Sequence, residues 1–413
     1  MKRKTTIIFL VSLLNLTGCL NIIDNNSSTN NSSNSSSSSL LSSTSSKNDS
    51  SLSSSKNNPK ETYTVTWKNY NGEVLEIDNE VIYGTFPKYN DDTPLKEGTD
   101  QVRYIFNGWS PKLNIVTSDI TYTATFVEVN NNDIIPGVYP VISSDKKTVQ
   151  YGFYPQSYVK DLSFISTLET LEPTSYNNWY LYEGNYYVKE KAKVYNNENY
   201  TFNDGVSIVN ENEYWFKCEP ITWNILSSLG GTYTLLSSLL LDAHNYYNNY
   251  DSRVENNEII YSNNYKESDI REWLNNDFYN KAFGLNNTFI QNSYIDNSAR
   301  TLDVNSDEYI CSNTLDKVFL PSYQDYLNSE FGFEVDSNSS SNTRTCKTSE
   351  YTRVRGSWYN TTSSLKYNGS YWTRTPSSEY SYCAWNVNSS GYLSTYAIDG
   401  VSHSVRPSIT ICF

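Results

Sequence analysis

The chain has 413 residues, of which 37% are hydrophobic and 18% charged, and its 31 Lys and Arg against 45 Asp and Glu give a formal net charge of -14 at pH 7. This balance provides no basic surface to neutralise phosphates, so nucleic acid is not an expected partner, and attachment to anionic lipid by charge alone is not expected either. The length allows two modest domains, and 37 Tyr and nine Trp beside many Asn and Ser predict a β-rich fold of the α+β class.

The N-terminus has the order of an export signal. Three basic residues at 2–4 precede an apolar run at 5–14, and the sequence L-T-G-C closes the segment at Cys19. The apolar run is shorter than the ~20 residues that cross a membrane as a helix. The closing residues resemble the lipobox of bacterial lipoproteins, which implies a lipoprotein signal peptide at 1–18 and acyl chains such as palmitate on Cys19.

The lipobox resemblance also implies a location. Two acyl chains on Cys19 would hold the protein stably in membrane lipid, because each buried CH₂ group contributes ~0.8 kcal/mol. We therefore expect a lipid-anchored protein at the extracellular face of the cell membrane. The alternative is an ordinary secretory signal that happens to contain a Cys.

Residues 19–62 combine the lipidated Cys19 with a low-complexity linker. Asn and Ser dominate residues 21–60, so this tract cannot bury enough apolar surface to offset its conformational entropy. A flexible coil of this length would span roughly 35 Å, which predicts a disordered tether. An adhesive, prion-like segment is the alternative, although the tract contains no aromatic residue.

A small β module is predicted at 63–128. Strand-like runs lie at 63–67, 81–87, 104–111 and 121–126, and Asn71-Gly72 is typical of a hairpin turn. Their patterns T-V-T-W, V-x-Y-G-T-x-P, F-x-G-W-S-P and Y-T-A-T-F resemble the internalin-type B-repeat, a β-grasp-like module. The resemblance implies a cell-surface spacer or adhesion module. We expect its core to contain Trp67, Phe106, Trp109 and Phe126.

A linker at 129–135 leads to a longer, irregular α+β domain at 136–413. We expect a strand at 151–156, a short helix at 163–171, a hairpin at 179–195 and buried strands at 214–227 and 232–241. The clearest helix is 268–283, where Ser268 can cap the first turn. Ile270, Trp273, Leu274 and Phe278 form its apolar stripe.

Seven ordered motifs in this domain resemble an extracellular bacterial domain of unknown function. They lie at 151–156, 220–226, 235–243, 271–278, 316–322, 372–376 and 405–407, and they include W-x-R-S/T-P and a closing V-R-P. More distantly, the segment from W-x-R-S/T-P to V-R-P is similar to the tail of formylglycine-generating-like and C-type-lectin-like folds. That similarity implies an α+β fold with long loops and carries over no reaction.

The motifs of those folds are incomplete here. Oxidases of the formylglycine-generating group need two closely spaced Cys, whereas Cys383 and Cys412 lie far apart in sequence. Lectins need a W-N-D triplet, and this chain has Trp385-Asn386-Val387. We therefore favour a non-enzymatic binding or adhesion module for an extracellular protein or glycan. An enzyme related to formylglycine-generating oxidases is the alternative.

The sequence contains no complete metal-binding or catalytic motif. His244 and His403 are the only histidines, so a multi-histidine zinc site is excluded. Asp303, Asn305 and Asp307 have the spacing of a calcium loop, but the Gly and bidentate Glu that such a loop needs are absent. We expect no catalytic residues, no metal and no cofactor.

The residues predicted to bind a ligand lie between 372 and 406. The candidate residues are Trp372, Arg374, Trp385, Tyr392 and Arg406. A hairpin is predicted after Pro376, with its turn near Ser389-Ser390-Gly391. Its aromatic residues Tyr382, Trp385, Tyr392 and Tyr396 could form a sugar platform, or they could be ordinary cross-strand pairs. The two Arg could hold a carboxylate between them, or each could be a buried structural residue bonded to backbone carbonyls.

Five cysteines remain after Cys19: Cys218, Cys311, Cys346, Cys383 and Cys412. Export permits disulfides without requiring them. An odd number leaves at least one thiol free or paired between chains. Our first choice for a pair is Cys383 with Cys412, although spacing alone does not determine the connectivity.

Overall fold

The computed structural model describes residues 61–99, 101–130, 135–197, 199–298, 301, 308–400 and 402–413. The signal peptide, Cys19 and the Asn/Ser tract lie outside the described residues, as do Asp303, Asn305 and Asp307. Within the described ranges, no helix is both long and apolar enough to cross a membrane. Strands hold 40% of the described residues and helices 12%, so the predicted β-rich α+β class is confirmed.

The first module is a four-stranded sheet in the order β2-β1-β4-β3. Its strands are β1 (Thr62–Lys68), β2 (Val74–Ile82), β3 (Val102–Ser110) and β4 (Ile120–Asn130). The predicted Asn71-Gly72 turn joins β1 to β2, with Gly72 at a φ of 87°. The second strand lies earlier than predicted, and β4 includes the first two residues of the expected linker.

The core of the first module is aromatic, as predicted. The Trp67 ring is fully buried and lies 4.7 Å from the Trp109 ring and 5.0 Å from the Tyr122 ring. Phe106 is buried and contacts the partly buried Phe126 edge to face. Edge-to-face and offset stacked rings stabilise such a small core beyond the area they bury.

The larger domain is built on a twisted sheet in the order β16-β21-β10-β9-β6-β5. Its strands are β5 (Val141–Ile142), β6 (Thr148–Tyr158), β9 (Glu213–Leu229), β10 (Thr232–Ser237), β16 (Val318–Phe319) and β21 (Ser408–Cys412), with β7 (Tyr180–Tyr182) and β8 (Asn185–Lys191) beside β9. The predicted hairpin at 179–195 is present, and the strands predicted at 214–227 and 232–241 pair with each other around Gly230-Gly231.

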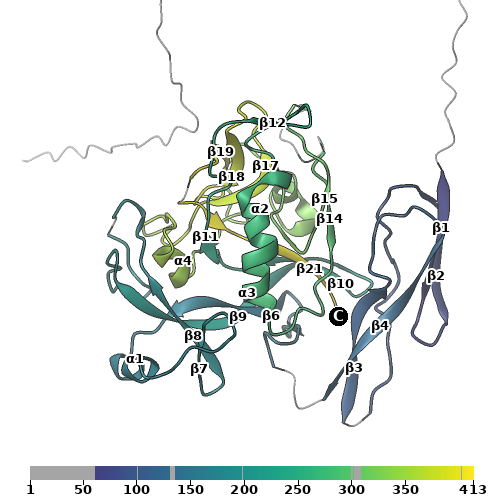
Figure 1. Ribbon diagram of the computed structural model, residues 1–413, viewed down its shortest axis with the longest axis horizontal. Coiled ribbons are helices and arrows are strands. Elements are labelled where there is room, and N and C mark those ends of the chain that lie inside the picture. The colour runs from purple at the N-terminus through teal and green to yellow at the C-terminus, as the bar shows by residue number, and fades with distance from the viewer. Residues whose placement is uncertain are drawn as a thin grey trace, which may run out of the picture.

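The predicted helix at 268–283 is present but has a wider turn in its middle. It comprises α2 (Asp269–Trp273), the π-helical segment η3 (Leu274–Phe278) and α3 (Tyr279–Phe283). The Ser268 hydroxyl caps it by accepting a hydrogen bond from the Arg271 N–H. Figure 1 shows this helix lying along the large sheet, and its Phe278 ring is 5.0 Å from the Tyr154 ring of β6.

A second, five-stranded sheet has the order β11-β20-β17-β18-β19. Its strands are β11 (Asp242–Ala243), β17 (Tyr371–Pro376), β18 (Cys383–Val387), β19 (Leu393–Ala397) and β20 (Ser404–Val405). As predicted, β18 and β19 form a hairpin, and its turn contains Gly391 at a φ of 78°. Three of the five predicted ligand residues, Trp372, Arg374 and Trp385, lie in this sheet. Tyr392 directly precedes β19, and Arg406 directly follows β20.

The remaining elements are short. The helices are α1 (Leu162–Leu168), α4 (Glu350–Val354) and the 3-10 turns η1 (Tyr195–Asn197), η2 (Tyr265–Glu267), η5 (Asp325–Leu327) and η6 (Ser329–Phe331). Two small two-stranded antiparallel sheets pair β12 (Arg253–Glu255) with β13 (Glu258–Ile260) and β14 (Ser293–Ile295) with β15 (Thr314–Asp316). Asp161 caps α1, the helix predicted at 163–171.

The two modules lie against each other (Figure 1). Cys412 of β21 is buried in the core cluster of the first module, although it is the penultimate residue of the chain. The Phe86 ring stacks on the Tyr294 ring at 5.8 Å. The glycine turn between β9 and β10 meets the loop around Tyr89 and Thr93. The first module therefore has an extensive contact with the larger domain.

Candidate functional site

Trp372 is part of the protein core. It is fully buried, its Nε1 donates to the His244 carbonyl at 2.9 Å, and its ring stacks on His403 with centroids 4.3 Å apart. The prediction that Trp372 contacts a ligand is therefore wrong. The burial follows from its place in β17, the central strand of the five-stranded sheet.

Arg406 is also a structural residue. Only 4% of it is exposed, its Nε donates to the Ser237 carbonyl, and its Nη1 donates to the Tyr371 hydroxyl, both at 3.1 Å. These partners correspond to the structural alternative raised by the sequence, in which the Arg is satisfied inside the protein. The prediction of a ligand contact at Arg406 is wrong.

Arg374 has partners of its own. Its Nη1 donates to Asp325 Oδ2 at 2.8 Å and to the Leu320 carbonyl at 3.0 Å, and its Nη2 approaches the Asp296 carbonyl at 3.4 Å. Because Asp325 supplies the counter-charge from inside the protein, no external anion is needed.

The two Arg bond different parts of the protein. Arg374 donates to Asp325 and to the Leu320 carbonyl, whereas Arg406 donates to the Ser237 carbonyl and to the Tyr371 hydroxyl. The two guanidinium groups share no partner, so the predicted shared carboxylate site is wrong.

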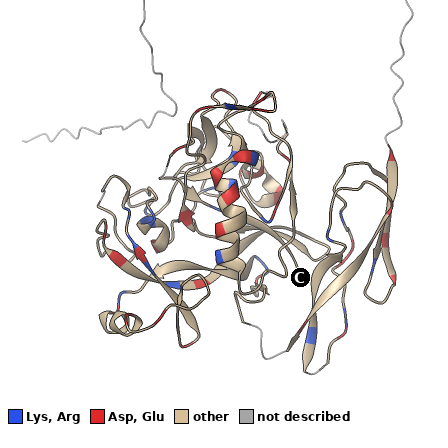
Figure 2. Ribbon diagram, in the orientation of Figure 1, with Lys and Arg blue, Asp and Glu red and all other residues tan. Residues whose placement is uncertain are grey.

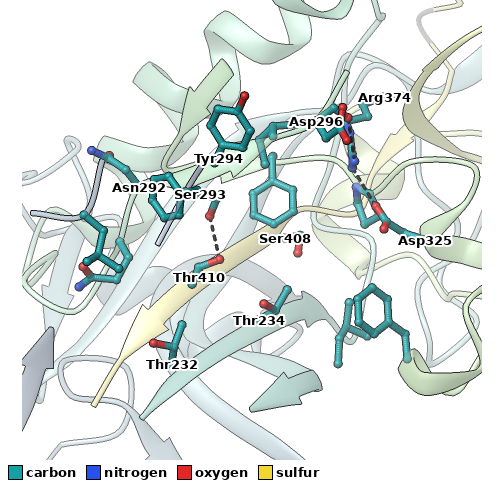
Figure 3. A pocket seen from close by; sticks show the side chains of 18 of the residues that line it. Thr232, Thr234, Asn292, Ser293, Tyr294, Asp296, Asp325, Arg374, Ser408 and Thr410 are labelled. Carbon is teal, nitrogen blue, oxygen red and sulfur yellow. Dashed lines mark hydrogen bonds and ion pairs between the residues drawn. The ribbon is translucent and has the colours of Figure 1, made fainter. Parts of the chain in front are cut away.

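Arg374 lines a cleft between the two modules, which we call the intermodule cleft (Figure 3). Its volume is about 370 Å³. Hydroxyl side chains from β10 and β21 form its floor, Phe86 of the first module and Tyr294 lie at its sides, and the Arg374–Asp325 pair closes one end. The Ser293 hydroxyl donates to Thr410 Oγ1 across it at 2.7 Å. The exposed lining is mainly apolar.

The aromatic residues of the β18–β19 hairpin separate into two groups. Trp385 is half-buried and lies edge-on to Tyr323, with ring centroids 4.5 Å apart. Its neighbour Asn386 points to the other face, where it is paired in register with Ser394 between Tyr392 and Tyr396. The single platform that would include both Trp385 and Tyr392 is therefore wrong, whereas Tyr392 and Tyr396 do share a cavity.

That cavity, which we call the tyrosine pocket, has a volume of about 260 Å³. Its aromatic walls are Tyr195, Trp358, Tyr392 and Tyr396. Its amides and hydroxyls come mainly from Asn386, Asn388, Ser389, Ser394 and Ser402, and His403 lies beside them. None of the described residues that line it is Asp, Glu, Lys or Arg.

Hydrogen bonds fix the polar side of the tyrosine pocket. The Asn386 side chain is 2% exposed, and its Oδ1 accepts from the Ser394 hydroxyl at 2.9 Å across the hairpin. Asn388 Oδ1 accepts from the backbone N–H groups of Ser390 and Tyr392 at 2.9 and 3.1 Å. The turn is thereby closed in the conformation that places Tyr392 at the pocket, where 37% of it is exposed.

His403 is one of the buried residues of the tyrosine pocket, with 5% of it exposed. Its imidazole lies between Trp372 and Tyr396, with ring centroids 4.3 and 4.4 Å away. Burial lowers the pKa of His403 to about 3, so the ring is neutral at physiological pH. Its Nδ1 is buried without a hydrogen-bond partner among the described residues.

Sequence reasoning missed three residues of the tyrosine pocket. His403 was considered only as a metal ligand, and Tyr195 and Trp358 lie in irregular segments far from the hairpin in sequence. Only the spacing of Tyr392 and Tyr396 gave a signal, because residues an even number of positions apart on one strand share a face.

The cysteines give no reactive pair in the described residues. Cys218, Cys311, Cys346 and Cys412 are free thiols, so the predicted Cys383–Cys412 disulfide is wrong. Cys412 is fully buried, and burial raises the pKa of its thiol to about 12, which makes it a poor nucleophile. The described residues also contain no group of three His, Cys, Asp or Glu side chains that could hold a metal ion.

Comparison with known families gives one match. Residues 230–412 match the model of DUF6273, a domain of unknown function. The match includes five of the seven motifs identified in the sequence, from 235–243 to 405–407, and it contains the whole β18–β19 hairpin. No curated protein and no solved structure is significantly similar to the chain.

Proposed function

We propose that the chain is a surface lipoprotein, anchored through Cys19, whose larger domain binds a neutral glycan in the tyrosine pocket. The observation that carries this proposal is the composition of the pocket: aromatic ring faces beside amides and hydroxyls, with no charged side chain among the described lining residues. A sugar ring has apolar C–H faces and a rim of hydroxyls, so it needs both kinds of surface. Concave sites with apolar walls and a few placed polar groups are typical ligand sites.

Charge and size both favour a small neutral ligand over an anion or a protein. Acidic and basic residues are interspersed over the described part of the chain (Figure 2), and the net charge of -14 would repel an acidic ligand. A protein partner would need about 800 Å² of surface on each side, whereas the tyrosine pocket is a small hollow with a volume of about 260 Å³. The pocket therefore suits part of a glycan.

An enzyme related to formylglycine-generating oxidases is the second candidate. That chemistry requires two reactive thiols close together at an open cleft. The buried Cys412, with its raised thiol pKa, does not supply one, and no other observation favours the enzyme over the binding module.

A tyrosine variant tests the glycan site. We expect Tyr392→Ala to weaken binding of a neutral glycan by the purified full-length chain about tenfold, because the exposed ring provides one wall of the pocket. Tyr382→Ala is a matched control, since Tyr382 is 38% exposed and lies on the same hairpin outside the pocket. A neutral glycan array followed by titration of the hits provides the measurement. Absence of any glycan hit, or equal effects of the two variants, would refute the proposal.

A cysteine variant tests the anchor. We expect Cys19→Ala to leave an uncleaved precursor or to release the protein into the medium, because the acylated thiol is lost. Detergent phase partitioning and the mass of the mature N-terminus measure the outcome. Cys311→Ala, at a partly exposed free thiol, should partition like the wild type. Continued acylation of the Cys19→Ala protein would contradict lipid attachment at this position.

A further inference from the structure

We infer that His403 determines the sugar specificity of the tyrosine pocket by exchanging a hydrogen bond between its unpaired ring nitrogen and one hydroxyl of a neutral sugar ring. This inference rests on the proposed glycan binding and names its ligand class more closely. No group of three His, Cys, Asp or Glu side chains in the described part of the chain includes His403, so a metal site does not explain its position.

The Nδ1 atom of His403, a residue that is 5% exposed, is buried without a hydrogen-bond partner among the described residues. Such an atom is uncommon inside a protein. Leaving such a group without a hydrogen bond costs about 1–3 kcal/mol. Of the described residues that line the tyrosine pocket, His403 alone has a buried side-chain atom without a partner. A ligand hydroxyl entering the pocket would remove this cost.

The imidazole is held in place before any ligand arrives. It lies between the rings of Trp372 and Tyr396. Trp372 is itself fixed by the hydrogen bond from its Nε1 to the His244 carbonyl. A polar group on a ring held from both sides loses little conformational entropy when a ligand binds, so its hydrogen bond contributes more to affinity and selectivity.

The neutral ring selects an uncharged hydroxyl. Burial holds the pKa of His403 far below physiological pH, so one ring nitrogen donates and the other accepts, and a hydroxyl can serve either role. The titratable groups that line the pocket with His403 are Tyr195, Tyr392 and Tyr396. Burial, Tyr195 and Asp399 together raise the pKa of Tyr396. A carboxylate ligand would be desolvated here without a cation to pair with.

The size of the pocket limits the ligand to one ring. Drug-sized ligands occupy cavities of ~300–1,000 Å³, and the tyrosine pocket holds about 260 Å³. A single sugar ring therefore enters, and the rest of a glycan remains outside. The pocket would recognise a terminal, neutral sugar residue.

Histidine NMR tests the contact directly in the wild-type protein. The chain has two histidines, so ¹⁵N-histidine labelling gives only the imidazoles of His244 and His403. Glucose, galactose, mannose and N-acetylglucosamine are the probes, and glucuronate is the charged counterpart. We expect the His403 nitrogen signals to move with one neutral sugar and not with glucuronate, while the His244 signals remain in place. Affinity should stay constant between about pH 5 and 8, because the neutral ring does not titrate there.

Deoxy sugars and a histidine variant identify the hydroxyl. We expect removal of one particular hydroxyl from the bound sugar to weaken wild-type binding about tenfold. His403→Phe keeps the ring stack but removes the nitrogen. It should bind the parent sugar about tenfold more weakly and should no longer distinguish that deoxy sugar. If this variant does not fold, the deoxy sugars and the histidine spectra of the wild type still test whether His403 bonds a sugar hydroxyl.

Two results would overturn the inference separately from the proposed function. Sugar binding that depends on Tyr392 while the His403 signals stay unmoved would refute the role of His403 and leave glycan binding intact. Equal sugar affinity of the His403→Phe and wild-type proteins would do the same. If the wild type binds none of the probes and no array glycan, the proposed function fails and the inference fails with it.

Discussion

Replacing Arg344 by alanine is expected to lower the free energy of unfolding by about 3–5 kcal/mol. The side chain is fully buried, and its guanidinium donates to four backbone carbonyls, those of Gly391, Glu334, Asp336 and Ser339, at 2.7–2.9 Å. The alanine variant strands these carbonyls and leaves a cavity. Urea denaturation of the full-length chain measures the loss.

Arg344 also connects the 334–339 loop to the turn that precedes Tyr392. The same variant should therefore weaken glycan binding where it still folds. Arg253→Ala is the control, because the Arg253 side chain is 33% exposed and pairs with Glu255 at the surface. Its expected effect is within about 0.5 kcal/mol. Similar losses of unfolding free energy in the two variants would show that the four buried hydrogen bonds of Arg344 stabilise the protein no more than the surface ion pair of Arg253 does.

Gly231→Ala is expected to destabilise the protein by about 3 kcal/mol. Gly231 has a φ of 73°, and a Cβ there would lie 2.6 Å from Thr93 Cγ2 and 3.0 Å from Phe106 Cδ1, both in the first module. The substitution therefore adds a clash between the modules to the strain of a left-handed residue. Thermal unfolding measures the loss of stability, and the rate of proteolysis between the modules measures how far the clash separates them.

Gly205→Ala separates the two causes. Gly205 has a φ of 89°, and a Cβ there would meet nothing within 4 Å. Its expected cost is about 1 kcal/mol, from the backbone alone. The difference in unfolding free energy between the Gly231→Ala and Gly205→Ala variants measures how much the contact between the modules contributes to stability. Equal losses would mean that the first module contributes no stability to the larger domain, and that it is a spacer joined only through the chain.

The contact between the modules determines which form of the protein suits binding measurements. The buried Cys412 lies in the core cluster of the first module, and Gly230 and Gly231 abut its loop. A fragment that begins after the linker would expose these surfaces to water. Binding measurements therefore belong on the full-length chain.

The sequence by itself determined the local elements. Alternating residues and the Asn71-Gly72 turn predicted the first hairpin, and Ser268 with the stripe at Ile270, Leu274 and Phe278 predicted the one long helix. Each of these depends on propensity and periodicity over a few neighbouring residues, which the sequence records directly. The turn at Gly391 was predicted for the same reason.

Only the tertiary structure decided which side chains share a site. Arg374 and Arg406 lie in or directly after the paired strands β17 and β20, but their guanidinium groups bond different parts of the protein. Register depends on pairings between distant segments and on the bulge within β17, and a shift of one residue exchanges the faces. The position of His403 between Trp372 and Tyr396 likewise required three separate segments to meet. Local periodicity does not encode contacts between distant segments, so the hairpin of the tyrosine pocket could be predicted from neighbouring residues, whereas Tyr195, Trp358 and His403 reach the pocket only through the fold.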